Sequence, residues 1–261
     1  MPRSLAALAL AIALAGCSAL PQRGSGTGFV ERSLVLGGIA RRYQVFVPSP
    51  RAGGRHPPVI LFLHGTGERG SDGDKPTRVG LGPYLRAHAD GFPAIVVFPQ
   101  ASEGDDWKGT AADIAFAALD QATAEFGGDR RRTYLTGLSM GGYGTWELAL
   151  LQPRRFAALV PVCGALLPPR DERDLFVTPL AGADDPYTAL AAQLRHVPSW
   201  IFHGARDDLV PPRDDRLTYA ALRAAGADVH YTEFPDANHN AWDPAYATPE
   251  LWAWLFERRR R

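Results

Sequence analysis

The chain has 261 residues, of which 46% are hydrophobic and 21% are charged. This composition is that of an ordinary globular protein, and the length is sufficient to bury one large hydrophobic core. Acidic and basic residues number 28 each, so the chain has no overall field that would attract nucleic acid or another polyanion.

The first 17 residues are predicted to be an export signal rather than part of the fold. Arg3 supplies a short positive start, and the apolar stretch 5–14 is too short to span a bilayer as a mature helix. The stretch leads into LAGC, which ends at Cys17 and resembles the lipobox of bacterial lipoproteins. That resemblance implies cleavage before Cys17 and its acylation, which would hold the protein on a membrane. An ordinary secretory signal with a chance cysteine is the alternative.

Residues 18–28, SALPQRGSGTG, are small and polar and predict a flexible tether, so one folded domain is expected over 29–261. In bacterial lipoproteins a residue other than aspartate after the acylated cysteine favours the outer membrane, and here that residue is Ser18. We therefore expect an exported protein, lipid-anchored at the outer membrane or periplasmic face. The only other cysteine is Cys163, so lipidation of Cys17 leaves no intramolecular disulfide.

The folded part is expected to open with an antiparallel hairpin. Its two strands are predicted at 32–36 and 42–47, around Gly37-Gly38. Apolar runs then predict further strands at 58–63, 94–98, 133–138, 156–162, 199–202 and 229–234. Apolar residues at helical spacing predict helices over 111–126, 141–152, 216–225 and 249–258.

Strands alternate with helices from about residue 58 onward. This alternation predicts a mostly parallel central sheet with helices on both faces. The stretch 163–197 leaves room for a small excursion from the sheet, but not for a large lid domain.

Ser139 is the candidate nucleophile, because it stands in the middle of the G-x-S-x-G pattern that runs from Gly137 to Gly141. A β-rich run at 132–135 precedes the pattern and a helix-forming run at 146–150 follows it, as a nucleophile elbow requires. Small neighbours allow the strand and the helix to approach closely around a strained serine. A serine that merely caps a helix is the alternative.

A serine at its free pKa is a poor nucleophile and needs a base held by a third group. In a fold of this kind the acid follows a later strand and the histidine follows the last strand. The strand that ends at His203-Gly204 is followed by Asp207 and Asp208, and either could be the acid. The last strand is followed by His239, which alone among the seven histidines stands in the expected place.

Two backbone N–H groups are expected to stabilise the oxyanion, each typically contributing about 3 to 4 kcal/mol in the transition state. Met140, directly after the nucleophile, would supply one of them. The glycine-rich loop after the first buried strand would supply the other, from Thr66 or alternatively from Gly65. Glu68 and Arg69 of this loop are expected to form an ion pair that fixes it.

Three aromatic residues are candidates for a substrate pocket, because they follow strand ends or the elbow. Trp107, Tyr143 and Trp242 could each stack on a ring of the substrate, although loop packing explains them equally well. The sequence contains neither a zinc-ligand spacing nor a phosphate-binding loop, so no metal and no cofactor is expected.

Four strings spread over residues 61–246 carry a family resemblance: LFLHGTGERG, YLTGLSMGGYGTWELAL, FHGARDDLVP and NHNAWDPAY. In them the chain resembles the α/β-hydrolases, in the esterase and predicted-peptidase branch with feruloyl esterases, polyhydroxybutyrate depolymerases and dienelactone-hydrolase-like enzymes. The resemblance implies the α/β-hydrolase fold, and its HGxxDxxVP pattern favours Asp207 as the acid. Asn238 departs from the pattern, because many relatives have glycine there.

The resemblance also implies a reaction, the hydrolysis of a carboxylic ester through an acyl-enzyme. His239 would take the proton of Ser139, the serine would attack the carbonyl, and water activated by His239 would release the acid. The expected partner is a small-molecule or polymer ester. A serine peptidase or amidase on the same triad, and a non-catalytic binding lipoprotein, are the alternatives.

Overall fold

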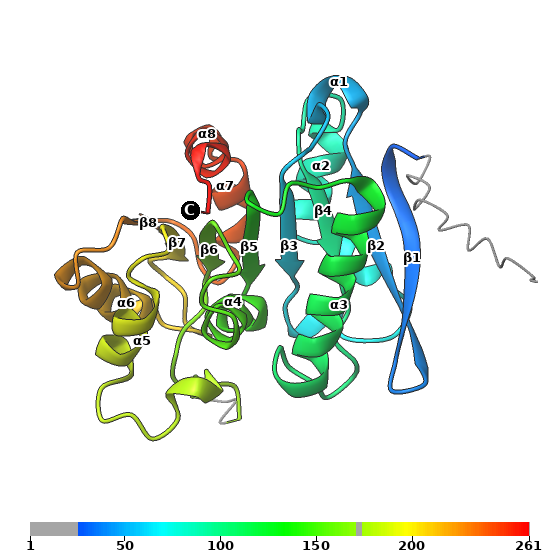
Figure 1. The fold of residues 1–261 in the computed structure, drawn as a ribbon. Coiled ribbons are helices and arrows are strands. Elements are labelled where there is room, and N and C mark those ends of the chain that lie inside the picture. The colour runs from blue at the N-terminus through cyan, green and yellow to red at the C-terminus, as the bar shows by residue number, and fades with distance from the viewer. Residues whose placement is uncertain (1–25, 171–173, 261) are drawn as a thin grey trace, which may run out of the picture.

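The computed structural model describes residues 26–170 and 174–260. The predicted signal, the lipobox and most of the tether lie outside these residues. The centre of the fold is an eight-stranded sheet in the order β1-β2-β4-β3-β5-β6-β7-β8 (Figure 1). The strands are β1 (Gly28–Leu36), β2 (Ile39–Val47), β3 (Val59–Leu63), β4 (Ile95–Phe98), β5 (Thr133–Leu138), β6 (Ala158–Val162), β7 (Ser199–Gly204) and β8 (Val229–Phe234).

Helices connect and cover the strands. The α-helices are α1 (Pro50–Gly53), α2 (Leu81–His88), α3 (Gly109–Phe126), α4 (Met140–Leu151), α5 (Pro186–Leu194), α6 (Arg213–Ala224), α7 (Trp242–Tyr246) and α8 (Pro249–Glu257). Three short 3-10 turns complete the inventory: η1 (Thr66–Glu68), η2 (Lys75–Thr77) and η3 (Thr178–Leu180). Across the ranges 26–170 and 174–260, every helix is too short or too polar to cross a bilayer.

The sheet is mixed, as the sequence predicts. β2 pairs antiparallel with β1 and β4, and the strands from β4 through β8 pair parallel. The hairpin is longer than predicted, because all nine residues of β1 pair with β2, from Gly28 opposite Val47 to Leu36 opposite Ile39. The extra pairs involve residues 28–31 of β1 and 39–41 of β2, which continue the ladder through backbone hydrogen bonds beyond the predicted apolar stretch.

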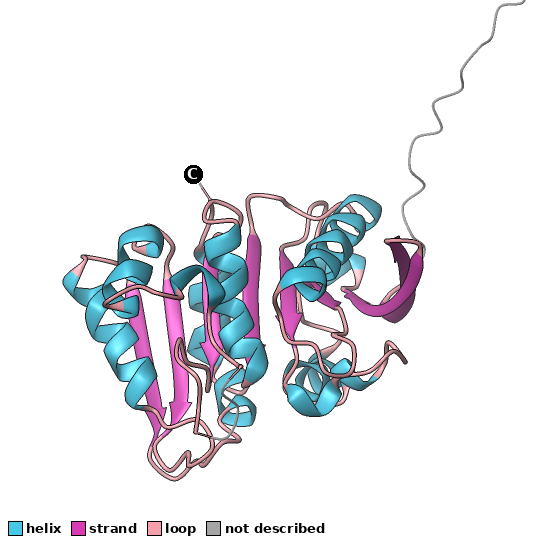
Figure 2. Cartoon of the chain, turned by 90° about the horizontal axis from the view of Figure 1, so that it is seen from below, coloured by secondary structure: helices cyan, strands magenta, loops and turns pink. Residues whose placement is uncertain are grey.

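Two hydrophobic cores lie on the two faces of the sheet, because successive side chains of a strand point in opposite directions. In β3, Leu61 and Leu63 join the core under α3, α4, α5 and α6. Ile60 and Phe62 join the second core, under α2, α7 and α8. Figure 2 shows the strands with helices along them. The three-layer α/β-hydrolase architecture predicted from the sequence is therefore present.

Sequence patterns missed the shorter helices α2, α5 and α7. Helix α2 carries Gly82 and Pro83 in its first turn, which weakens any helical signal. The excursion 163–197 contains only η3, α5 and loops among its described residues, so it forms no large lid there.

The turn between β5 and α4 is the tightest point of the fold. Ser139 has φ 52° and ψ −121°, a conformation that a non-glycine residue rarely adopts. A Cβ atom on Gly137 would lie 2.1 Å from the carbonyl oxygen of Gly141, and one on Gly141 would lie 2.0 Å from that of Leu63. The two glycines of the G-x-S-x-G pattern are therefore required by close backbone approach.

Replacing Gly141 by alanine should consequently destabilise the whole domain. We expect Gly141→Ala to lower the free energy of unfolding by about 3 kcal/mol or more, because the new methyl group meets backbone on β3. Urea denaturation followed by circular dichroism measures this change. Gly91→Ala is the matched control, since its Cβ would meet no atom within 4 Å, and it should change stability by less than about 1 kcal/mol. Equal stability of the two variants would contradict the steric account.

Candidate active site

Three side chains far apart in the chain meet at the carboxyl edge of the sheet. Ser139 precedes α4, Asp207 follows β7 and His239 follows β8. Nε2 of His239 lies 2.8 Å from Oγ of Ser139, and Nδ1 of the same ring lies 2.7 Å from Oδ2 of Asp207. The structure thus brings together the serine, the acid and the histidine that the sequence singled out.

The partners of His239 define its tautomer. The ionised carboxylate of Asp207 only accepts hydrogen bonds, so Nδ1 carries the proton and Nε2 accepts the hydroxyl hydrogen of Ser139. This arrangement leaves Nε2 as the base that faces the serine.

The carboxylate of Asp207 is buried but well supplied with donors. Its Oδ1 accepts the backbone N–H groups of Leu209 and Val210, at 3.0 and 2.9 Å. Burial alone would raise the pKa of Asp207, but hydrogen bonds from His203 and His239 outweigh it and hold the pKa well below its ordinary value. The neighbouring Asp208, which the sequence left as a competitor, is exposed.

The loop after β3 has one N–H group without an acceptor and one that is bound within the loop. The N–H of Gly65 donates to the carboxylate of Glu68, at 3.1 Å. In the described ranges, by contrast, the N–H groups of Thr66 and Met140 have no acceptor, as expected at the first positions of η1 and α4. Thr66 and Met140 are therefore available to an oxyanion, whereas Gly65 is not.

The expected ion pair between Glu68 and Arg69 is wrong. Glu68 binds the backbone of Gly65 instead, and Arg69 donates to the backbone carbonyl of Asp105. Each side chain holds the loop separately, because the tight turn directs them to different partners.

His64 holds the same loop through hydrogen bonds of its ring. Its Nδ1 donates to the carbonyl of Gly65 at 2.6 Å, and its Nε2 accepts the N–H of Ala101 at 3.0 Å. The ring is therefore neutral, and burial lowers its pKa to about 4. Trp107 also binds this segment, since its Nε1 donates to the backbone carbonyl of His64 at 2.9 Å.

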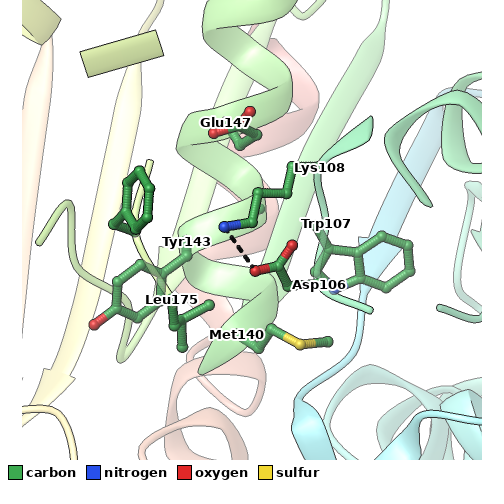
Figure 3. Close-up of a pocket in the computed structure, with 9 residues that line it drawn as sticks. Asp106, Trp107, Lys108, Met140, Tyr143, Glu147 and Leu175 are labelled. Atoms are coloured by element: carbon green, nitrogen blue, oxygen red, sulfur yellow. Dashed lines mark ion pairs between the residues drawn. The ribbon is translucent and has the colours of Figure 1, made fainter. Parts of the chain in front are cut away.

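The three aromatic candidates for the pocket have different surroundings. Trp107 is only 2% exposed and lines a small pocket of about 10 Å³ together with Met140 and Tyr143 (Figure 3). Its position matches the loop-packing alternative. Tyr143 is also buried, and its hydroxyl donates to the carbonyl of Leu167 at 3.1 Å. Trp242 is half-buried and sets its edge against the ring of His239, with 5.6 Å between centroids.

A larger groove of about 520 Å³ opens on the other side of Tyr143. Its walls come from residues 165–170, from 184–187 and from the segment 210–217 that follows the Asp207 loop. Sequence reasoning missed this groove, because its walls combine loops with the first turns of α5 and α6, which are far apart in the sequence.

One set of side chains could in principle hold a metal ion, since ligand atoms of Cys163, Asp207 and His239 lie within 4.8 Å of one another. The imidazole and the carboxylate already share a hydrogen bond, however. Burial also raises the pKa of the Cys163 thiol well above its ordinary value, and a protonated thiol is a poor ligand. The donor set therefore suits an acid–base pair better than a metal.

Known proteins with similar sequences include esterases, although no family model matches the chain. A bifunctional acetylxylan esterase/xylanase of Neocallimastix patriciarum is 28% identical over 178 residues, which cover 66% of this chain and 22% of that protein. An acetyl esterase of Caldicellulosiruptor saccharolyticus is 27% identical, over 44% of this chain and 50% of that protein. An uncharacterised secreted protein of Arthroderma benhamiae is 26% identical, over 70% of this chain and 21% of that protein. The matches thus span half or less of these relatives.

Solved structures show the same fold. A thermostable esterase superposes with a TM-score of 0.72 at 28% identity, covering 89% of this chain and 63% of that one. A fluorophosphonate-binding serine hydrolase of Staphylococcus aureus has a TM-score of 0.66 at 19% identity, covering 88% of this chain and 99% of the other. A ferulic acid esterase has a TM-score of 0.63 at 20% identity, over 88% and 97%. With its strand order and its elbow, the chain therefore has the α/β-hydrolase fold, and it is similar in sequence and structure to esterases.

Proposed function

We propose that the protein hydrolyses carboxylic esters, with Ser139 as nucleophile, His239 as general base and Asp207 as the acid that orients the base. The observation that carries this proposal is the unbroken path of hydrogen bonds, 2.8 and 2.7 Å long, from the serine oxygen through the imidazole to the carboxylate. Such a path lets the serine lose its proton as it attacks.

The reaction proceeds in two acyl-transfer steps. Nε2 of His239 takes the Ser139 proton while Oγ attacks the ester carbonyl, and the N–H groups of Thr66 and Met140 receive the oxyanion. The imidazolium then protonates the leaving alcohol, which leaves an acyl-enzyme. Water enters, gives a proton to Nε2 and releases the carboxylic acid, and Asp207 steadies the ring throughout.

We propose short acyl groups, such as acetyl, on a larger alcohol as the substrate class. The pocket beside Met140 measures only about 10 Å³, whereas the groove beside Tyr143 measures about 520 Å³ and is open to solvent. The groove has room for a bulky sugar or phenolic alcohol, whereas the small pocket has room for about one water molecule and does not define the acyl group. The relatives named acetyl esterase and acetylxylan esterase support the same class.

Removing the serine hydroxyl should abolish catalysis. We expect Ser139→Ala to lower kcat/KM on p-nitrophenyl acetate by at least ~10³-fold, because no nucleophile remains on the elbow. The same variant should lose covalent labelling by a fluorophosphonate probe and keep its thermal unfolding curve.

Ser33→Ala is the control, since Ser33 is exposed on the edge strand β1 and should leave both readouts unchanged. Labelling of the Ser139→Ala protein to the level of the unaltered protein would rule out this nucleophile. Labelling without turnover of any ester, but with turnover of an aminoacyl amide, would favour a peptidase. Absence of labelling in the unaltered protein would favour a binding protein.

The two adjacent aspartates should behave very differently. Asp207→Asn replaces an acceptor of His239 by a side chain that can donate to Nδ1, which favours the wrong tautomer, so kcat should fall by about 10³- to 10⁴-fold. Asp208→Asn changes only an exposed side chain and should alter kcat by less than about twofold. Steady-state kinetics of the pair makes the comparison, and a larger loss in Asp208→Asn would refute the assignment.

We further propose that the protein is exported and anchored through a lipid on Cys17. The LAGC string that ends at Cys17 supports the anchor, and the similar secreted protein of Arthroderma benhamiae supports export. An active site facing the outside of the cell would meet polymeric esters that cannot enter the cell.

Lipidation can be tested by metabolic labelling with a palmitate analogue in a bacterial host. Cys17→Ser should remove the label and release the protein from the membrane fraction, because the acylated side chain is lost. Cys163→Ala should retain the label, since Cys163 is a buried residue after β6. Labelling that persists in Cys17→Ser would contradict the proposed anchor.

A further inference from the structure

A second histidine lies behind the acid of the site. His203, in β7, is fully buried and its ring is surrounded by acceptors. Nε2 lies 2.8 Å from the carbonyl oxygen of Val210 and 3.2 Å from Oδ2 of Asp207. Nδ1 lies 2.8 Å from Oδ2 of Asp215, in the first turn of α6. No other part of the proposed mechanism uses this residue.

Hydrogen-bond chemistry determines how His203 is protonated. A backbone carbonyl can only accept, so Nε2 must carry a hydrogen. Nδ1 faces the carboxylate of Asp215, and a second hydrogen on this nitrogen makes the ring an imidazolium between two carboxylates. His64 provides the contrast, because its Nε2 accepts from the N–H of Ala101 and its ring is therefore neutral.

The electrostatics of the cluster agree with a cationic ring. Burial alone would lower the pKa of His203, but hydrogen bonds to Asp207 and Asp215 outweigh it and raise the pKa to about 10. Burial raises the pKa of Asp215 to about 6, which still leaves it ionised at neutral pH.

Asp215 needs the contact with His203 because its own charge is buried. Its side chain is fully buried, and within the described ranges its Oδ1 has no hydrogen-bond partner. The positive end of α6 and the ring of His203 are therefore what offsets the cost of burying this charge. His203 and Asp215 thus form a fixed pair, and the carboxylate of Asp207 contacts the His203 ring of this pair.

Among the described residues, the acidic or neutral ionisable groups around His203 are Asp214 on α6, Glu233 and Tyr231 on β8, and the protonated Cys163 after β6. The cation Arg216 on α6 is paired with Glu233. His239 in turn faces Asp207, the hydroxyl of Ser139 and the thiol of Cys163. His203 is thus the positive charge that lies against Asp207 opposite His239.

We propose that His203 is a positioning residue of the triad, an imidazolium locked by Asp215 that holds the Asp207 carboxylate in the orientation required by His239. This inference rests on the proposed esterase function only for its catalytic readout. It extends the path of polar contacts to five groups, from Ser139 through His239, Asp207 and His203 to Asp215, with an ion pair at the step between Asp207 and His203.

The sign of the expected pH effect follows from the charge. The cation at His203 partly neutralises Asp207 and so reduces the stabilisation that Asp207 gives to a protonated His239. Removing the cation should therefore favour the protonated form of His239. The base is then protonated up to a higher pH, and the acid limb of kcat/KM moves upward.

His203→Gln is the direct test, because glutamine keeps a donor but loses the charge. We expect kcat on p-nitrophenyl acetate to fall by about tenfold or more, with KM changed by less than about threefold, since orientation rather than substrate binding is lost. The acid limb of the pH profile should move up by about one unit. His230→Gln, a half-exposed histidine on the neighbouring β8, should change none of these.

Nuclear magnetic resonance of the ring nitrogens supplies a readout that does not depend on turnover. In the unaltered protein at neutral pH, His203 should have both nitrogens protonated, and His239 should titrate at a higher pH in His203→Gln. These spectra would show the effect of His203 on His239 even if the protein lacked esterase activity. Failure of the proposed function would therefore be recognised separately from failure of this inference.

A neutral His203 in the unaltered protein at neutral pH would overturn the inference. So would a folded His203→Gln protein with unchanged kcat and an unchanged acid limb. Should His203→Gln fail to fold, Asp215→Asn provides the second variant, because loss of its counter-charge should neutralise the His203 ring. The spectrum would show that loss, and a His203 that stayed doubly protonated in Asp215→Asn would refute the lock.

Discussion

Backbone crowding at the end of β5 is the constraint on which the site depends. The chain must leave a central strand, expose one side chain and enter α4 within a few residues, while β3 passes within contact distance of the turn. Glycines at 137 and 141 permit this, since a Cβ at either place would lie about 2 Å from a carbonyl oxygen. Ser139 takes the strained conformation, and its hydroxyl is presented at the edge where the neighbouring loops meet.

Close backbone approach at a second glycine positions the loop that carries His239. A Cβ on Gly204, at the end of β7, would lie 2.0 Å from the carbonyl oxygen of Asn238. The loop that carries His239 can therefore cross directly over the end of β7, where Asp207 begins its own turn. The strand-end glycine thus lets the His239 loop pass close to the turn that begins with Asp207, and Asn238 contributes its backbone to that crossing.

Two His-Gly strand ends perform opposite electrostatic tasks in one sheet. His64, after β3, accepts an N–H and is neutral, with a pKa lowered to about 4 by burial. His203, in β7, meets only acceptors, and its pKa rises to about 10. The neutral ring supports the loop after β3, and the charged ring contacts Asp207. Residue type and local sequence are alike, so the difference comes entirely from the partners.

The amino-acid pattern alone determined the sheet, the elbow, and the order of the serine, the aspartate and the histidine along the chain. Apolar runs and glycine spacing carry this information because they are local properties of a chain. Only the tertiary structure shows that Asp207 and not Asp208 contacts His239, and that the N–H of Gly65 is bound within its own loop, since neighbours in sequence differ in which way their bonds point. It also revealed the groove beside Tyr143 and the lock on His203. Both arise where loops and helices from distant parts of the chain come together, and no periodicity in the sequence records such encounters.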